Sequence, residues 1–165
     1  MRVFVILLFV INALFFSCRD VNADAAEYNN RVIRLQKKIT DDLSLLDSTL
    51  RDTRASKERT QYHYARVQAG VKHSILSLDS VGSFNNDPLL LLGARNLFRS
   101  YEKIIDEDYR RLIEFKHLPA EAVTLAIQDS SIEVQNEIRK ASQMAQDEFI
   151  LVQKEFALKF HLELK

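Results

Sequence analysis

Apolar side chains recur every three or four residues along almost the entire chain, and this spacing constrains the fold more than any other feature. It is the spacing of one face of an α-helix. Only three Gly and two Pro interrupt the 165 residues, and residue types that favour helices, such as Leu, Ala, Lys, Glu, Arg and Gln, are abundant. The sequence therefore predicts an all-α protein, an up-down-up-down four-helix bundle with a long C-terminal helix.

The first two helices are expected at about residues 26–52 and 57–81. Residues 51–61 contain no large apolar side chain, so we place the turn between these helices near Thr53–Ser56. The side chains expected to face the core in the two helices are Tyr28, Val32, Leu35, Ile39, Leu43, Leu46 and Leu50, followed by Tyr64, Val67, Val71, Ile75 and Leu78.

The clearest loop in the sequence is residues 82–88, because Gly82 suits the end of a helix and Asp87-Pro88 suits the start of the next. A third helix is expected from there to about residue 117, and a fourth from near Ala120. Their expected core side chains are Leu90, Ala94, Leu97, Tyr101, Ile105, Tyr109, Leu112 and Phe115, then Val123, Ile127, Val134, Ile138, Ala141, Ala145, Phe149, Val152 and Phe156.

The four expected helices differ in length. The fourth has room for about 40 residues and the others for about 25 to 30, which leaves a surplus of roughly 15–20 Å at about 1.5 Å per residue. We therefore expect the fourth helix to kink near Asp129–Ser131, to overhang its neighbours, or to stop early.

The N-terminus has the pattern of a lipoprotein signal peptide over residues 1–17. Arg2 supplies a positive charge, an apolar run extends from Val3 to Ser17, and Cys18, the single cysteine of the chain, follows directly. Residues 15–18 (FFSC) resemble a lipobox, although that motif usually begins with Leu followed by two small residues. This resemblance implies that Cys18 is the lipid attachment residue. Residues 18–26 would then form a polar tether to a helical domain at 27–165.

Three other interpretations of the leader are open. An uncleaved membrane anchor would need roughly 20 apolar residues, and this run holds about 15. An ordinary secretory signal could be cut after Ala25, and a buried N-terminal helix of a cytosolic protein is the third possibility. If Cys18 is lipidated, the turns near residues 53–56 and 117–120 face away from the membrane, whereas the loop 82–88 and the C-terminus face toward it.

The charges of the chain are balanced, with 23 Lys and Arg against 23 Asp and Glu. A nucleic-acid partner is not expected, because such proteins present a clearly basic domain. Residues 51–72 are locally basic and include Tyr62-His63-Tyr64. This stretch fits either a patch for an anionic ligand or partner, or a solvated helical hairpin with Tyr64 in the core.

The sequence offers weak candidates for a metal site. Glu114 and His117 form one E-x-x-H motif, whereas carboxylate-bridged di-iron bundles use two such motifs and two further inward Glu. Glu27, at the very start of the first helix, is its nearest further candidate. The acidic run Asp106-Glu107-Asp108 cannot converge on one ion, because successive helix residues point in different directions. We therefore expect no metal, cofactor or catalytic residue.

Three tyrosines, Tyr28, Tyr101 and Tyr109, fall on the apolar faces of the expected helices. Their rings are expected in the core. Their hydroxyl groups would then need buried hydrogen-bond partners or a position at the edge of the bundle.

Several short motifs resemble those of an uncharacterised family of bacterial surface lipoproteins. The resemblance covers most of the chain after Cys18 and rests on Tyr28-Asn29, Gln36, Asp87-Pro88, residues 98–101, Asp108-Tyr109 and residues 153–160. It implies a helical bundle at the envelope of a Gram-negative bacterium, without an assigned activity or catalytic residues.

We expect a lipid-anchored, non-enzymatic helical bundle in the bacterial cell envelope, at the outer membrane, that binds another envelope or extracellular protein. Its membrane contact would be the N-terminal lipid. The alternative is a ferritin-like metal-binding or redox protein. A third possibility is an accessory subunit whose long last helix completes a coiled coil of its partner.

Overall fold

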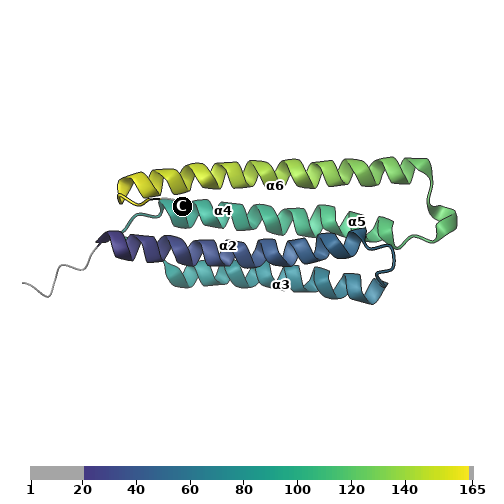
Figure 1. Ribbon diagram of the computed structural model, residues 1–165, viewed down its shortest axis with the longest axis horizontal. Helices are drawn as coiled ribbons and strands as arrows, with labels where there is room; N and C mark the ends of the chain where they lie inside the picture. The colour runs from purple at the N-terminus through teal and green to yellow at the C-terminus, as the bar shows by residue number, and fades with distance from the viewer. Residues whose placement is uncertain (1–20, 164–165) are drawn as a thin grey trace, which may run out of the picture.

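The computed structural model describes residues 21–163, and its regular elements are all helical (Figure 1). The predicted all-α class is confirmed for this part of the chain. The predicted signal peptide and Cys18 lie outside the described residues. The elements are α2 (Val21–Arg51), α3 (Lys57–Val81), α4 (Leu89–Ile104), the π-helical segment η1 (Ile105–Tyr109), α5 (Arg110–Lys116), the 3₁₀ helix η2 (Ala120–Ala122) and α6 (Leu125–Lys159).

Helix α2 begins at Val21, earlier than the expected start near residue 26. Residues 21–26, expected to belong to a polar tether, are therefore helical. Ala23, Ala25 and Ala26 explain the difference, because Ala has the highest intrinsic helix propensity. Ala25 is also fully buried, so this first part of the helix is held by packing.

The turn between α2 and α3 lies where the sequence places it. Ser56 caps α3 by accepting a hydrogen bond from the backbone N–H of Arg59 at 3.2 Å. The end of α2 is held from another helix, since Lys116 Nζ donates to the carbonyl oxygens of Leu50 at 3.2 Å and Asp52 at 2.8 Å. These bonds satisfy carbonyl groups that a helix end leaves without partners.

The predicted loop at 82–88 is confirmed. Gly82 has a positive φ of 68°, which a residue without Cβ adopts at no steric cost. Asn85 and Asn86 also have left-handed backbones, and the carboxylate of Asp87 accepts the N–H of Leu89 at 2.8 Å to start α4.

The third helical stretch is continuous from Leu89 to Lys116, but one segment of it, η1, is a π-helix. A π-turn holds more residues than an α-turn, since its hydrogen bonds span five residues. The wide turn absorbs about one extra residue, so Leu112 and Ile113 return to the buried face that Leu97 and Tyr101 occupy in α4.

Helix α6 begins at Leu125 rather than near Ala120, because residues 120–122 form the separate turn η2 and Thr124 caps the helix by accepting the N–H of Ile127. It is unbroken through Asp129–Ser131, and its first turns reach beyond α5 (Figure 1). Of the three expectations for this helix, the overhang is therefore observed.

The helices pack in chain order: α2 mainly on α3, α3 on α4, and α4 on α6. Helices α4 and α6 approach very closely at Gly93, where an added Cβ would lie 2.6 Å from Cγ1 of Val152. The start of α2, the loop 82–88 and the end of α6 lie at one end of the molecule (Figure 1). None of the described helices is both long and apolar enough to cross a membrane.

Candidate functional site

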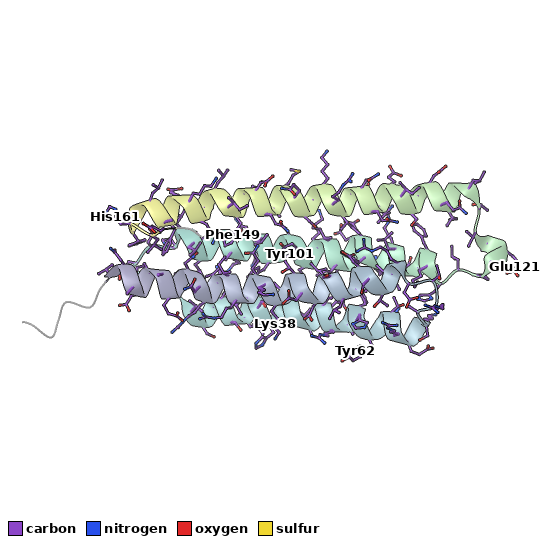
Figure 2. The ribbon with its side chains drawn as sticks, viewed as in Figure 1. Lys38, Tyr62, Tyr101, Glu121, Phe149 and His161 are labelled. Atoms are coloured by element: carbon purple, nitrogen blue, oxygen red, sulfur yellow. The ribbon has the colours of Figure 1, made fainter. Side chains whose placement is uncertain are left out.

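A groove of about 980 Å³ separates α2 from α6. It extends from Thr40 to Arg51 along α2 and from Ile127 to Gln146 along α6. Helices α4 and α5 and the segment η1 supply its floor, which consists of the side chains Tyr101, Tyr109, Leu112 and Phe115. Figure 2 shows Tyr101 about midway along the molecule, between the end that carries His161 and the connection that carries Glu121.

The α6 wall of the groove is polar but almost uncharged. Helix α6 contributes one charged residue, Arg139, although it carries many acidic and basic residues elsewhere. Helix α2 contributes Thr40 and Ser44, with Asp47 and Arg51 nearer its end. The amide and hydroxyl side chains that α6 presents to the groove are Gln128, Ser131, Gln135, Ser142, Gln143 and Gln146.

Two buried tyrosine hydroxyls on the floor have hydrogen-bond partners in the walls. Tyr109 donates to Asp47 Oδ1 at 2.7 Å, and Tyr101 accepts from Gln146 Nε2 at 3.0 Å. Burial raises the pKa of Tyr109 far above its ordinary value, and the carboxylate of Asp47 raises it further. The Tyr109 hydroxyl therefore stays protonated and holds the η1 segment against α2.

The groove is closed at the end where α2 begins. Gln153 Nε2 of α6 donates to Asn29 Oδ1 of α2 at 3.0 Å. Beyond this bond, four aromatic rings fill the space between the helices and the loop, with neighbouring ring centres 4.7 to 5.9 Å apart. We call this region the aromatic end; its rings are Tyr28, Phe84, Phe156 and Phe160.

The charged residues that line the groove are mostly cations. They are Arg51, Lys116 and Arg139, against the single carboxylate of Asp47. Among the described residues, no carboxylate oxygen lies within 4.0 Å of any of the three cations. The groove therefore carries unneutralised positive charge.

The residues proposed as metal ligands do not assemble. Glu114 is exposed, His117 is half-buried as the C-cap of α5, and Glu27 binds Arg34 at 2.7 Å. Burial lowers the pKa of His117, and the neighbouring Lys116 lowers it further. Within residues 21–163, no three His, Cys, Asp or Glu side chains lie close enough to hold an ion together.

The acidic run diverges as predicted. Asp106 accepts a hydrogen bond from Gln68 of α3 at 2.7 Å, Glu107 is exposed, and Asp108 lies 3.7 Å from Arg111. Burial raises the pKa of Asp108 above its ordinary value, and the nearby Glu137 raises it further.

The basic stretch at residues 51–72 lies partly on the surface. Tyr62 is exposed, whereas Tyr64 is half-buried against the core and its hydroxyl accepts from Gln68 at 3.3 Å. The charge of Arg66 is used internally, since its Nε lies 2.7 Å from the buried carboxylate of Asp42. Arg51 and Thr53, at the start of this stretch, line the groove, and Arg51 is the charged one of the two.

The three tyrosines predicted for the core are all buried, and each hydroxyl has a partner. Tyr28 donates to the carbonyl oxygen of Gly82 at 2.7 Å, and Tyr101 and Tyr109 have the partners given above. These predictions are confirmed, and the two tyrosines on the third helical stretch belong to the groove.

Comparison of the chain with protein-family models, with characterised proteins and with solved structures gave no match. The resemblance to bacterial surface lipoproteins therefore stays a prediction. Sequence reasoning missed the groove itself. A signal was present in the stripe Gln128, Ser131, Gln135, Arg139, Ser142 and Gln146, which recurs at helical spacing and contains a single charge.

Proposed function

We propose that the protein is a lipid-anchored, non-enzymatic binding module of a bacterial cell envelope. In this proposal the four helical stretches form an up-down-up-down bundle that is open along the seam between α2 and α6. The groove in that seam is the binding surface, and it is the observation that carries the proposal.

The chemistry of the groove supports binding. Its volume of about 980 Å³ is at the upper end of the range for ligand sites, about 300–1,000 Å³. The floor offers aromatic and aliphatic surface, and the walls offer amide and hydroxyl groups that donate and accept hydrogen bonds. A partner that fills the groove would gain apolar burial and directional contacts together.

The proposed anchor orients this surface. Two residues, Arg19 and Asp20, separate Cys18 from the first residue of α2. A lipid on Cys18 would therefore keep the aromatic end close to the bilayer. The groove would open toward the far end of the bundle, where a soluble or membrane-bound neighbour can reach it.

The anchor is tested by metabolic labelling with palmitate. Wild-type protein should incorporate the label, and the Cys18→Ala variant should lose it. Mass spectrometry of the mature protein should find an acylated Cys18 as its first residue. Equal labelling of the two proteins, or a free thiol at Cys18, would contradict the anchor.

The binding surface is tested by site-specific photo-crosslinking in intact cells. A photoreactive residue at Gln135 lies in the groove, whereas one at the adjacent Asn136 lies on the exposed surface outside it. We expect a discrete crosslinked product from position 135 that is absent from position 136. Identical products from both positions would show that the groove is not the contact surface.

A further inference from the structure

We infer that the groove between α2 and α6 receives an amphipathic helix of a partner protein that carries acidic residues along the edges of its apolar face. This inference rests on the proposed function and adds the chemistry of the partner.

The dimensions and surroundings of the groove favour a helix as its occupant. The groove follows α6 from Ile127 to Gln146, which is about 28 Å at about 1.5 Å per residue. A partner helix of about 20 residues would span it. Two helices form the walls and a third lies beneath, the arrangement in which a further helix packs its ridges into the space between them.

An extended peptide finds less support in the same groove. The backbone of an extended peptide needs external hydrogen-bond partners, which a sheet edge supplies. The described residues contain no strand, so they present no such edge. A helix satisfies its own backbone groups and requires only side-chain contacts from its receptor.

The α6 wall, uncharged except for Arg139, allows such a helix to enter without a large desolvation penalty on that side. Binding would displace water from amide and hydroxyl groups, such as those of Ser44 and Gln135. These groups can form hydrogen bonds with polar side chains of the partner instead. The apolar face of the partner would meet Leu43, Tyr101 and Phe115. Arg139 is the one charge of the α6 wall; it donates to Asn136 Oδ1 at 3.1 Å and has no carboxylate partner, so its remaining N–H groups are available to a carboxylate at the edge of the partner.

The positive charge of the groove favours a partner helix with negatively charged flanks. Arg51, Lys116 and Arg139 lack carboxylate partners, and Asp47 already accepts the hydroxyl of Tyr109. Arginine binds carboxylates in a bidentate manner, so Arg51 and Arg139 are suited to Glu or Asp on the flanks of an amphipathic helix. Basic flanks would instead meet like charge.

The test uses the mature lipidated protein, which begins at Cys18, in phosphatidylcholine vesicles and three fluorescent 21-residue peptides. The first peptide has Leu at helical spacing flanked by Glu, the second has Lys in place of each Glu, and the third is a scrambled form of the first. Fluorescence anisotropy of each peptide measures its binding, and vesicles without protein are the control for binding to lipid alone. We expect the acidic peptide to bind at least tenfold more tightly than either of the others.

Groove variants test where the peptide binds. Ser44→Trp and Gln135→Trp fill the groove, and each should weaken binding of the acidic peptide at least tenfold. The matched variants Ser48→Trp and Met144→Trp, which place the same ring on exposed positions outside the groove, should bind as wild type does. Circular dichroism checks that all four retain the helical fold.

Charge variants test the selectivity. The double variant Arg51→Glu, Arg139→Glu should prefer the basic peptide, whereas the control Arg54→Glu, Lys140→Glu should keep the wild-type preference, because Arg54 and Lys140 do not line the groove. Equal affinity for the acidic and basic peptides would overturn the inference, as would equal loss in the two double variants.

Two other occupants would also overturn it. Wild-type protein that binds laurate but none of the peptides, together with loss of laurate binding in Gln135→Trp, would show that the groove holds an anionic amphiphile. Dimerisation in detergent that Gln135→Trp abolishes would show a second copy of the chain. In either case the photo-crosslink at position 135 and the palmitate label can persist, so failure of this inference is distinguishable from failure of the proposed function.

Discussion

The aromatic end and the groove are built from the same helices, but the space between α2 and α6 is filled by side chains at the aromatic end and open along the groove. At the aromatic end, Tyr28 and Phe156 are almost fully buried and their ring centres lie 5.8 Å apart. Along the groove, Leu43 and Leu50 of the same α2 stripe are only half-buried, and Ile132 of α6 is 58% exposed. A regular apolar stripe therefore ensures a helix face but does not ensure that the face is covered.

The side chains that border the seam account for the difference. Large rings fill the space at the aromatic end, whereas Gln135 and Ser142 face it from α6 along the groove. Closing the groove against α2 would remove water from these amides and hydroxyls without supplying enough partners, and an unpaired buried polar group costs about 1–3 kcal/mol. The groove stays open because the apolar burial gained by closing it would not offset the cost of these unpaired polar groups.

The sharpest test of this comparison is truncation of one large side chain in each region. Phe156→Ala should destabilise the protein by about 3–5 kcal/mol, because Phe156 is 1% exposed in a tightly packed site. Leu43→Ala should cost about 1 kcal/mol, because water already reaches this half-buried side chain. Urea unfolding measures both. Equal losses would mean that the groove is closed in solution.

The second test compares two buried tyrosine hydroxyls. Tyr109→Phe should cost about 1.5–3 kcal/mol, because it removes a hydrogen bond to the charged carboxylate of Asp47. Tyr28→Phe should cost about 0.5–1.5 kcal/mol, because the acceptor is the neutral carbonyl of Gly82. Thermal unfolding of the two variants gives the ranking, and a larger loss for Tyr28→Phe would contradict it.

The third test moves the boundary between the two regions. Asn29→Ala removes the acceptor for Gln153 and should cost about 1 kcal/mol. Amide exchange should accelerate in α2 next to residue 29 as the seam opens further. Asn30→Ala, an exposed neighbour on the same helix, is the matched control and should leave exchange unchanged.

The smallest expected effect is a difference in acid sensitivity. Burial lowers the pKa of His117, so the folded state favours the neutral ring. The associated stability is complete above the ordinary value of about 6.5 and falls as the pH drops through the window below it. Urea unfolding of the wild type, repeated between pH 7 and 5, should show a small decline in the free energy of unfolding as the pH falls. His117→Gln should abolish this decline.

Asp87, at the aromatic end, serves as the control for that titration. Lys159 lowers the pKa of Asp87 most, and the N–H of Leu89 lowers it further. Its stabilisation is therefore present above its ordinary value of about 3.8 and is lost only at lower pH. Asp87→Asn should leave the slope between pH 7 and 5 unchanged. A change of that slope in Asp87→Asn would show that the two ends do not titrate independently.

Local sequence signals predicted the helices well. The stretch without large apolar residues marked the turn at Thr53–Ser56, and Gly82 with Asp87-Pro88 marked the loop. The predicted start of α2 was wrong because the polar residues Asn22 and Asp24 suit a tether as well as the first turns of a helix, whereas the burial of Ala25 shows only in the structure. The predicted start of α6 was wrong because Pro119 is followed by the separate 3₁₀ turn η2, and the residue that caps α6 is Thr124.

The groove was beyond local signals because it depends on how far α6 stands from α2. The predicted core positions Leu43, Leu50 and Ile127 lie on the expected faces, yet they are half-buried. Spacing identifies a face but cannot say whether a neighbour covers it. The uncharged Gln and Ser residues of α6 carry that information only when the facing helix is known.

The π-helical segment has a consequence for how the chain tolerates changes of length. Because Ile105–Tyr109 accommodates about one residue more than an α-helix would, deleting Glu107 should convert the segment to ordinary α-helix and preserve the rotational register of α5. The same deletion at Arg99, in regular helix, would rotate every later side chain of the helix by about 100°. The segment η1 is thus the one turn of the third helical stretch that can lose a residue without rotating the side chains that follow it.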